Sequence, residues 1–121
     1  MVELSELIFE AYRYIKLRKY LDAALIYERI GKTIFKADSK SALDYFRLAI
    51  KYYLKSVLDY NKNNLPDNSA KCYENIAKLY RRWLKDSSKA VDYFMAATKY
   101  RMISLRSQLD YFEEDQENSK I

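Results

Sequence analysis

Two segments of this 121-residue chain repeat each other closely, and this duplication constrains the fold more than any other feature. DSKSALDYFRLAIKY at residues 38–52 returns 48 residues later as DSSKAVDYFMAATKY at residues 86–100, with more than half of the positions identical. A shorter pair, YERIGK at 27–32 and YENIAK at 73–78, repeats at an offset of 46. A two-residue difference in an intervening turn reconciles these offsets. Such a period is typical of repeat proteins, in which each unit covers the apolar face of its neighbour.

The apolar residues predict that the repeated unit is made of helices. They recur at three- and four-residue steps along nearly the whole chain, and no segment alternates with a period of two. The chain has one glycine, Gly31, and one proline, Pro66. Strand hairpins and phosphate-binding loops need more of both residues. We therefore predict an all-α fold of about five helices.

These helices are expected to form a single domain over residues 1–112. It divides into an extra helix at 3–16, a helical hairpin at 21–60 and a second hairpin at 67–112. The segment NKNNLPDNS at 61–69 is the strongest break, because Pro66 cannot continue a helix. Asp38 and Asp86, or the serines beside them, are predicted to cap the second helix of each hairpin. Four acidic residues gather in residues 113–121, which are predicted to be a flexible acidic tail.

Small and aromatic residues within the repeats resemble the tetratricopeptide arrangement. The matching positions are Ala11, Tyr14, Ala23, Tyr27, Ile30, Ala42, Phe46, Ala49, Ala77, Tyr80, Ala90, Phe94 and Ala97. The glycine and terminal proline of that motif are absent, and the unit is longer than its usual length. YENIAKLYRRWLKDSSKAVDYFMAATKY at 73–100 is more similar to the soluble NSF attachment proteins, whose helical hairpins are longer. Both resemblances imply antiparallel hairpins stacked as a short right-handed array, and neither implies an activity.

Catalytic, cofactor and metal sites are not expected. The chain has no histidine, which removes a catalytic histidine pair and the commonest zinc ligand. Cys72 has no cysteine partner and is best explained as a packed small residue. Asp44 and Asp92 recur with the repeat and are expected to form outward-facing ion pairs. No apolar run is long enough to span a membrane and no secretory signal is present, so we expect a non-enzymatic cytoplasmic protein.

Tyrosine is the most unusual component, with 13 in the chain. Six tyrosines fall in or beside the apolar stripes, whereas others, including Tyr45, Tyr52 and Tyr93, are expected to face outward, where tyrosine often contacts protein partners. Tyr45 precedes Phe46 as Tyr93 precedes Phe94, so one ring of each pair should enter the array while its neighbour faces a groove or partner.

A basic stripe is the second candidate surface. Lys71, Lys78, Arg82 and Lys85 share one side of the predicted fourth helix, with Arg81 nearby. These patterns predict a non-catalytic adaptor that presents a helical-repeat groove to a peptide or helix. The alternative is a nucleic-acid-associated protein that uses the basic stripe. Self-association is a third possibility, because a short array leaves its last helix uncovered.

Overall fold

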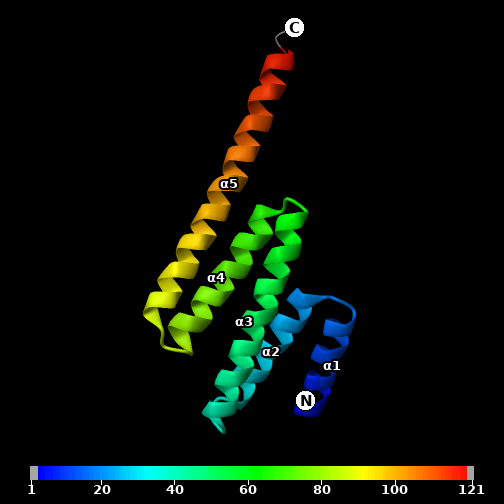
Figure 1. Cartoon of the computed structure of the whole chain (residues 1–121), viewed down its shortest axis with the longest axis vertical. Coiled ribbons are helices and arrows are strands. Elements are labelled where there is room, and N and C mark those ends of the chain that lie inside the picture. The colour runs from blue at the N-terminus through cyan, green and yellow to red at the C-terminus, as the bar shows by residue number, and fades with distance from the viewer. Residues whose placement is uncertain (1–2, 120–121) are drawn as a thin grey trace.

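The computed structural model describes residues 3–119, with side chains described as far as Gln116, and these residues form five α-helices joined by short turns (Figure 1). The helices are α1 (Leu4–Lys16), α2 (Tyr20–Ile34), α3 (Ser39–Lys62), α4 (Pro66–Arg82) and α5 (Ser87–Ser119). No strand occurs in this part of the chain. The predicted all-α fold of helical hairpins is confirmed.

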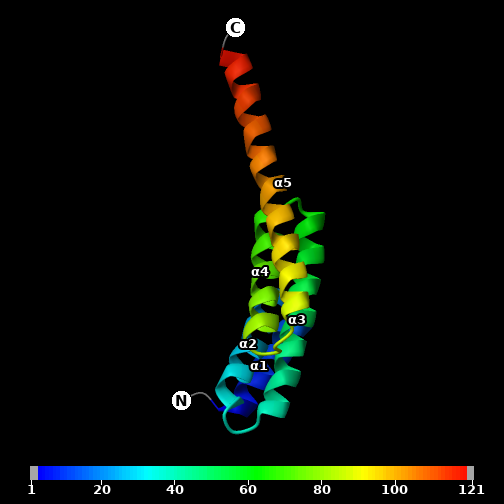
Figure 2. The same ribbon diagram turned by 90° about the vertical axis from the view of Figure 1, so that its left-hand side faces the viewer.

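Each helix packs against the helices that adjoin it along the chain. The hairpins α2–α3 and α4–α5 are joined where α4 packs against α3, and α1 covers α2. Within residues 3–119, no Cα atoms of α2 and α4 approach within 8 Å, and the same holds for α3 and α5. The molecule is therefore an open row of helices, and α5 extends beyond the ends of the others (Figures 1 and 2).

An aromatic cluster joins the two hairpins. Trp83, at the end of α4, stacks on Phe46 of α3 with ring centroids 5.0 Å apart. Phe35 meets the same tryptophan edge-on at 4.8 Å. Phe46 is completely buried, and burying a ring of this size contributes about 2 kcal/mol. Offset and edge-to-face contacts add to that value, so these rings contribute much of the free energy that holds the two hairpins together.

Gly31 is needed for close packing inside the first hairpin. A Cβ atom at this position would lie 2.6 Å from Cε1 of Phe46, well inside van der Waals contact. The duplicated segment places Ala77 at the equivalent position of the second hairpin, where Phe94 replaces Phe46. Phe46 is held by the next hairpin through Trp83, whereas Phe94 is only half-buried. The two hairpins therefore differ at this position because only the first has a hairpin packed behind it.

The ends of the helices follow local side-chain chemistry. The carboxylate of Asp38 accepts a hydrogen bond from the backbone N–H of Ser41 at 3.1 Å, and Asp86 accepts one from Lys89 at the same distance. These contacts confirm the two predicted caps. Three turns use the left-handed backbone region without glycine, at Arg18 (φ 58°), Asn64 (φ 55°) and Lys85 (φ 54°). The chain therefore forms tight turns despite its scarcity of glycine, because these three residues adopt the left-handed conformation instead.

The last helix is longer than the sequence predicts. Residues 113–119 continue α5 to Ser119 instead of forming a tail after residue 112; Lys120 and Ile121 lie outside the described residues. No glycine or proline follows Phe112, and glutamate and glutamine are good helix formers. A high density of acidic residues was therefore not sufficient to end the helix.

Candidate functional site

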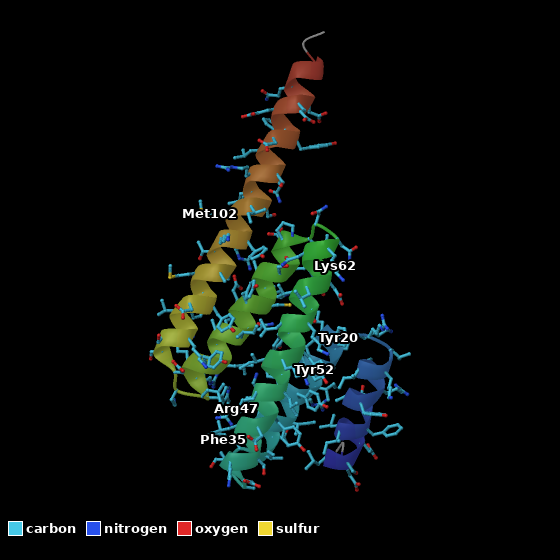
Figure 3. All side chains as sticks on the ribbon, viewed as in Figure 1. Tyr20, Phe35, Arg47, Tyr52, Lys62 and Met102 are labelled. Atoms are coloured by element: carbon cyan, nitrogen blue, oxygen red, sulfur yellow. The ribbon has the colours of Figure 1, made fainter. Side chains whose placement is uncertain are left out.

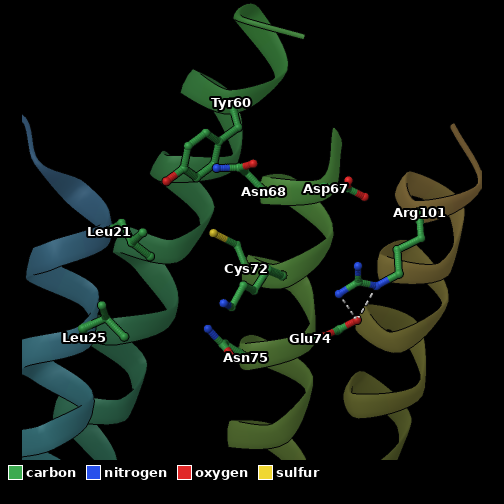
Figure 4. Close-up of a pocket in the computed structure, with 10 residues that line it drawn as sticks. Leu21, Leu25, Tyr60, Asp67, Asn68, Cys72, Glu74, Asn75 and Arg101 are labelled. Carbon is green, nitrogen blue, oxygen red and sulfur yellow. Dashed lines mark hydrogen bonds and ion pairs between the residues drawn. The ribbon is translucent and has the colours of Figure 1, made fainter. Parts of the chain in front are cut away.

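A groove lies between α2 and α4, the first helices of the two hairpins (Figure 4). Its volume is about 690 Å³, within the range of natural ligand sites. It is lined by Leu21 and Leu25 on α2, Tyr60 on α3, Asp67, Asn68, Lys71, Cys72, Glu74 and Asn75 on α4, and Arg101 on α5. The groove exists because α2 and α4 both pack on α3, while the backbones of α2 and α4 do not contact each other.

The wall of the groove on α2 is apolar. Leu21 and Leu25 lie one helical turn apart and project toward α4 (Figure 4). Leu25 is 47% exposed, although the two residues before it, Ala23 and Ala24, are buried. An apolar side chain that stays half in water at the edge of a concave site is available for contact with a partner.

The opposite wall carries charges and amides. Arg101 donates a hydrogen bond from Nε to Oε1 of Glu74 at 2.7 Å, and its Nη2 lies 2.7 Å from the same oxygen as an ion pair. The bond from Arg101 holds the pKa of Glu74 below its usual range, so this carboxylate stays ionised at neutral pH. No ion pair engages Lys71 in the described part of the chain. The groove can therefore offer an ammonium group and amide groups to a partner while its glutamate is already neutralised.

Two buried groups beside the groove are structural. Cys72 is 2% exposed, and burial raises the pKa of its thiol to about 11, which keeps it protonated and unreactive at neutral pH. The hydroxyl of Tyr53 donates to Oε1 of Glu28 at 2.7 Å and so links α3 to α2. Burial, followed by the charge of Glu28, raises the pKa of Tyr53, with the Asn75 side chain acting in the opposite direction. These buried contacts hold the helices beneath the groove in place.

The tyrosines predicted to face a partner lie in two stacked ladders. Tyr45, Tyr27 and Tyr52 stack between α3 and α2 with centroids 6.1 and 5.8 Å apart, and Tyr20 extends the stack (Figure 3). The equivalent residues of the second hairpin, Tyr93, Tyr73 and Tyr100, stack at 6.0 and 5.4 Å, with Tyr80 beside Tyr93. The duplication therefore extends from backbone to side-chain packing.

This stacking corrects one predicted contact and limits two others. Tyr52 is only 8% exposed, because it is enclosed by Tyr20 and Tyr27, so the prediction that it faces outward was wrong. Tyr45 and Tyr93 are half-buried in their ladders. Their free edges reach the surface, but neither residue lines the groove.

The predicted basic stripe is shorter than expected. Lys71, Lys78 and Arg82 are exposed along α4, but α4 ends at Arg82 and Lys85 lies in the following turn. Arg81 points elsewhere, with its guanidinium 5.5 Å from the Phe94 ring centroid on α5. Of all the predicted contact residues, only Lys71 lines the groove.

Most groove residues were missed by sequence reasoning. Leu21 and Leu25 belong to a helix whose buried stripe is marked by Ala23 and Ile30, and nothing in their own spacing separates a groove residue from any exposed leucine. The sequence indicated the groove only indirectly, because a duplicated hairpin implies a space between the first helix of one hairpin and the first helix of the next.

Comparison with known proteins assigns no family to this fold: no family model matches the chain, and neither a curated protein nor a solved structure is significantly similar to it. Among residues 3–119, no cluster of histidine, cysteine or acidic residues has an arrangement that could hold a metal ion. In the same range, no helix has both the length and the apolar character needed to cross a bilayer.

Proposed function

We propose that the protein is a non-catalytic adaptor or scaffold of the tetratricopeptide-like type, acting in the cytoplasm, whose α2–α4 groove receives a peptide or a helix from another protein. The groove is the observation that supports this function. One wall presents the exposed Leu25, and the other presents Lys71, which forms no ion pair within the described residues, beside Asn68. An apolar anchor with a few polar groups around it is the usual requirement for holding a peptide in a defined register.

A photo-crosslinking amino acid at position 25 tests the proposal directly. Leu58 on α3 is the matched control position, because it is also an exposed leucine (64%) but lies outside the groove. In nuclease-treated extract, the probe at position 25 should capture a defined protein that the probe at position 58 does not capture. Equal capture at both positions, or none at position 25, would contradict the proposal.

Binding measurements with the captured partner make the test quantitative. Leu25→Asp places a charge against the apolar wall and should weaken binding about tenfold or more, as expected for a buried contact residue. Leu58→Asp should leave the affinity within about twofold. If both variants bind equally well, the groove is not the contact surface.

The exposed cations of α4 support a second candidate, association with nucleic acid. Lys71, Lys78 and Arg82 share one helix face, and none forms an ion pair in the described part of the chain. Three phosphate contacts would make the logarithm of affinity fall with the logarithm of salt concentration with a slope of about 2.7. A partner held by Leu25 should respond far less to salt. A salt titration of binding therefore separates the two functions.

A further inference from the structure

One side of α5 is apolar and uncovered over most of the helix. Its residues are Val91, Met95, Met102, Leu105, Leu109 and Phe112, each more than half exposed, and they are called the α5 seam below. Successive members lie three or four residues apart, with Thr98 filling the position between Met95 and Met102. This alternation of three and four is the heptad spacing by which one helix packs along another. Met102 projects from α5 on the side away from α4 (Figure 3).

The repeat shows that three positions of the equivalent face are covered in the first hairpin. Counting back 48 residues, the counterparts of Val91, Met102 and Leu105 are Leu43, Leu54 and Val57 of α3. All three counterparts lie in the core or pack against it, together with residues of α4 such as Ile76. Within residues 3–119, α5 packs its backbone only on α4 and reaches α3 through the hydrogen bond from Asn61 to Tyr100, so nothing in this range covers the seam.

We propose that the α5 seam is covered by the α5 helix of a second copy of this chain, in an antiparallel two-helix coiled coil. The distribution of charge along α5 favours this occupant and this direction. Lys89, Lys99, Arg101 and Arg106, with a single acidic residue, Asp92, lie in its first two thirds, whereas Asp110, Glu113, Glu114, Asp115 and Glu117 lie in its last third. A parallel pair would bring the two acidic ends together, while an antiparallel pair places each acidic end beside the basic part of the other copy.

Charge pairing also selects the register. When Leu105 packs against Leu109 of the second copy, Met102 packs against Phe112 of the second copy, and the four central layers are apolar. In an antiparallel pair, the residues that follow Thr98, Leu105 and Phe112, which are e positions of the heptad, face e positions of the other helix. Lys99 then meets Glu113 of the second copy twice, by symmetry. At the twofold axis, Arg106 faces Arg106 of the second copy, and this is the one pair of like charges that the arrangement brings together.

The projecting end of α5 gains a role in this arrangement. In the last part of α5, residues 105–119, every described side chain is exposed, and the end of the helix extends beyond the other helices (Figure 2). In the dimer, this segment lies along residues 95–109 of the second copy, whose body occupies the opposite end. The overlap covers residues 95–119 of each copy, a contact about 37 Å long that includes every seam residue except Val91. A twofold interface of this kind closes on itself and does not lead to filaments.

Sedimentation equilibrium of the full chain over a wide concentration range tests the proposal. The wild type should be a dimer that dissociates on dilution. The double variant Leu105→Glu/Leu109→Glu should weaken dimerisation by at least about 100-fold, because it places charges in the central layers. Tyr111→Glu is the matched control, since Tyr111 is 70% exposed on the same segment but lies about 200° around the helix from Leu109. It should leave the dissociation constant nearly unchanged, and circular dichroism should show that both variants keep their helices.

Charge variants test the direction and register. Lys99→Glu and Glu113→Lys should each weaken the dimer, and the combination of the two should restore it. Arg106→Gln should strengthen the dimer by removing the like-charged meeting at the axis. A monomeric wild type at every concentration would overturn the proposal, as would a seam variant that dimerises like the Tyr111 control. Failure of the double charge reversal to restore the dimer would overturn the antiparallel register.

Discussion

Substitution of Gly31 by alanine sets two effects of opposite sign against each other. In the interior of a helix, replacing glycine by alanine normally stabilises by about 1 kcal/mol, because glycine is more flexible in the unfolded chain. Here the new Cβ would lie 2.6, 2.8 and 2.9 Å from three ring atoms of Phe46. Phe46 is fully buried and already stacks on Trp83, so its ring can move only if neighbouring side chains also move.

The steric effect should dominate. Overpacking a filled core costs about 1–3 kcal/mol, so the net effect of Gly31→Ala is a loss of about 1 kcal/mol in the free energy of unfolding. For a chain of this size, that loss lowers the melting temperature by about 4 °C. Urea unfolding followed by circular dichroism measures the effect, with every variant compared at one protein concentration, since self-association would add to apparent stability.

In a variant that lacks the Phe46 ring, the effect of Gly31→Ala on the free energy of unfolding should change sign. Phe46→Leu removes the ring atoms that the new methyl group would meet, so adding Gly31→Ala to it should raise the free energy of unfolding by about 1 kcal/mol. Ala77→Gly, at the equivalent position of the second hairpin, should destabilise by about 1–2 kcal/mol because it loses both helix propensity and a buried methyl group. Stabilisation by Gly31→Ala in the wild type, or the same sign in both backgrounds, would refute the steric argument.

Three further outcomes follow from the turns and from perturbed groups. Lys85→Gly should raise the free energy of unfolding by about 0.5 kcal/mol in a urea titration, because glycine relieves the left-handed backbone, whereas Lys85→Ala should bring no gain. Cys72 should react with Ellman's reagent roughly 100-fold more slowly in the native protein than in urea, since burial raises its thiol pKa from 9.0 to about 11; equal rates would exclude this burial. Hydrogen bonds from Ser41 lower the pKa of Asp38 from 3.8, so its ionised cap stabilises the protein above that value and the stabilisation is lost as the pH falls through the folded pKa. The stability difference between wild type and Asp38→Asn should therefore shrink in acid, as measured by thermal unfolding at several pH values.

Local features of the structure were predictable because neighbouring residues determine them. A helix cap needs only an acceptor and the N–H groups of the next turn, so Asp38 and Asp86 could be identified from the sequence. Helical periodicity and the duplication together gave the hairpins. Ladder formation by equivalent tyrosines was not anticipated, although the same duplication implies that any contact made in one hairpin is available to the other.

Features that depend on three helices at once were not predictable in the same way. The α3 helix packs on both α2 and α4, so its buried arc is wider than a single stripe and includes both Tyr52 and Tyr53. Periodicity placed only Tyr53 inside. The groove likewise combines Leu25, Tyr60 and Lys71 from three helices, and the register between helices depends on side-chain shapes at their contacts. The position of Lys85 depended on where one turn begins, which is the least certain boundary in any helical pattern.

The chain-order packing of the helices also has a consequence for how the protein acquires its structure. Among residues 3–119, the backbone of each helix packs only on the helices directly before and after it in sequence, so most contacts form without bringing distant segments together. Small proteins dominated by such local contacts acquire their structure in microseconds to milliseconds. Folding can start in either hairpin, and the other hairpin can then fold against the first. Loss of structure should begin at the outer helices, with the joint formed by Phe46 and Trp83 among the last contacts to separate.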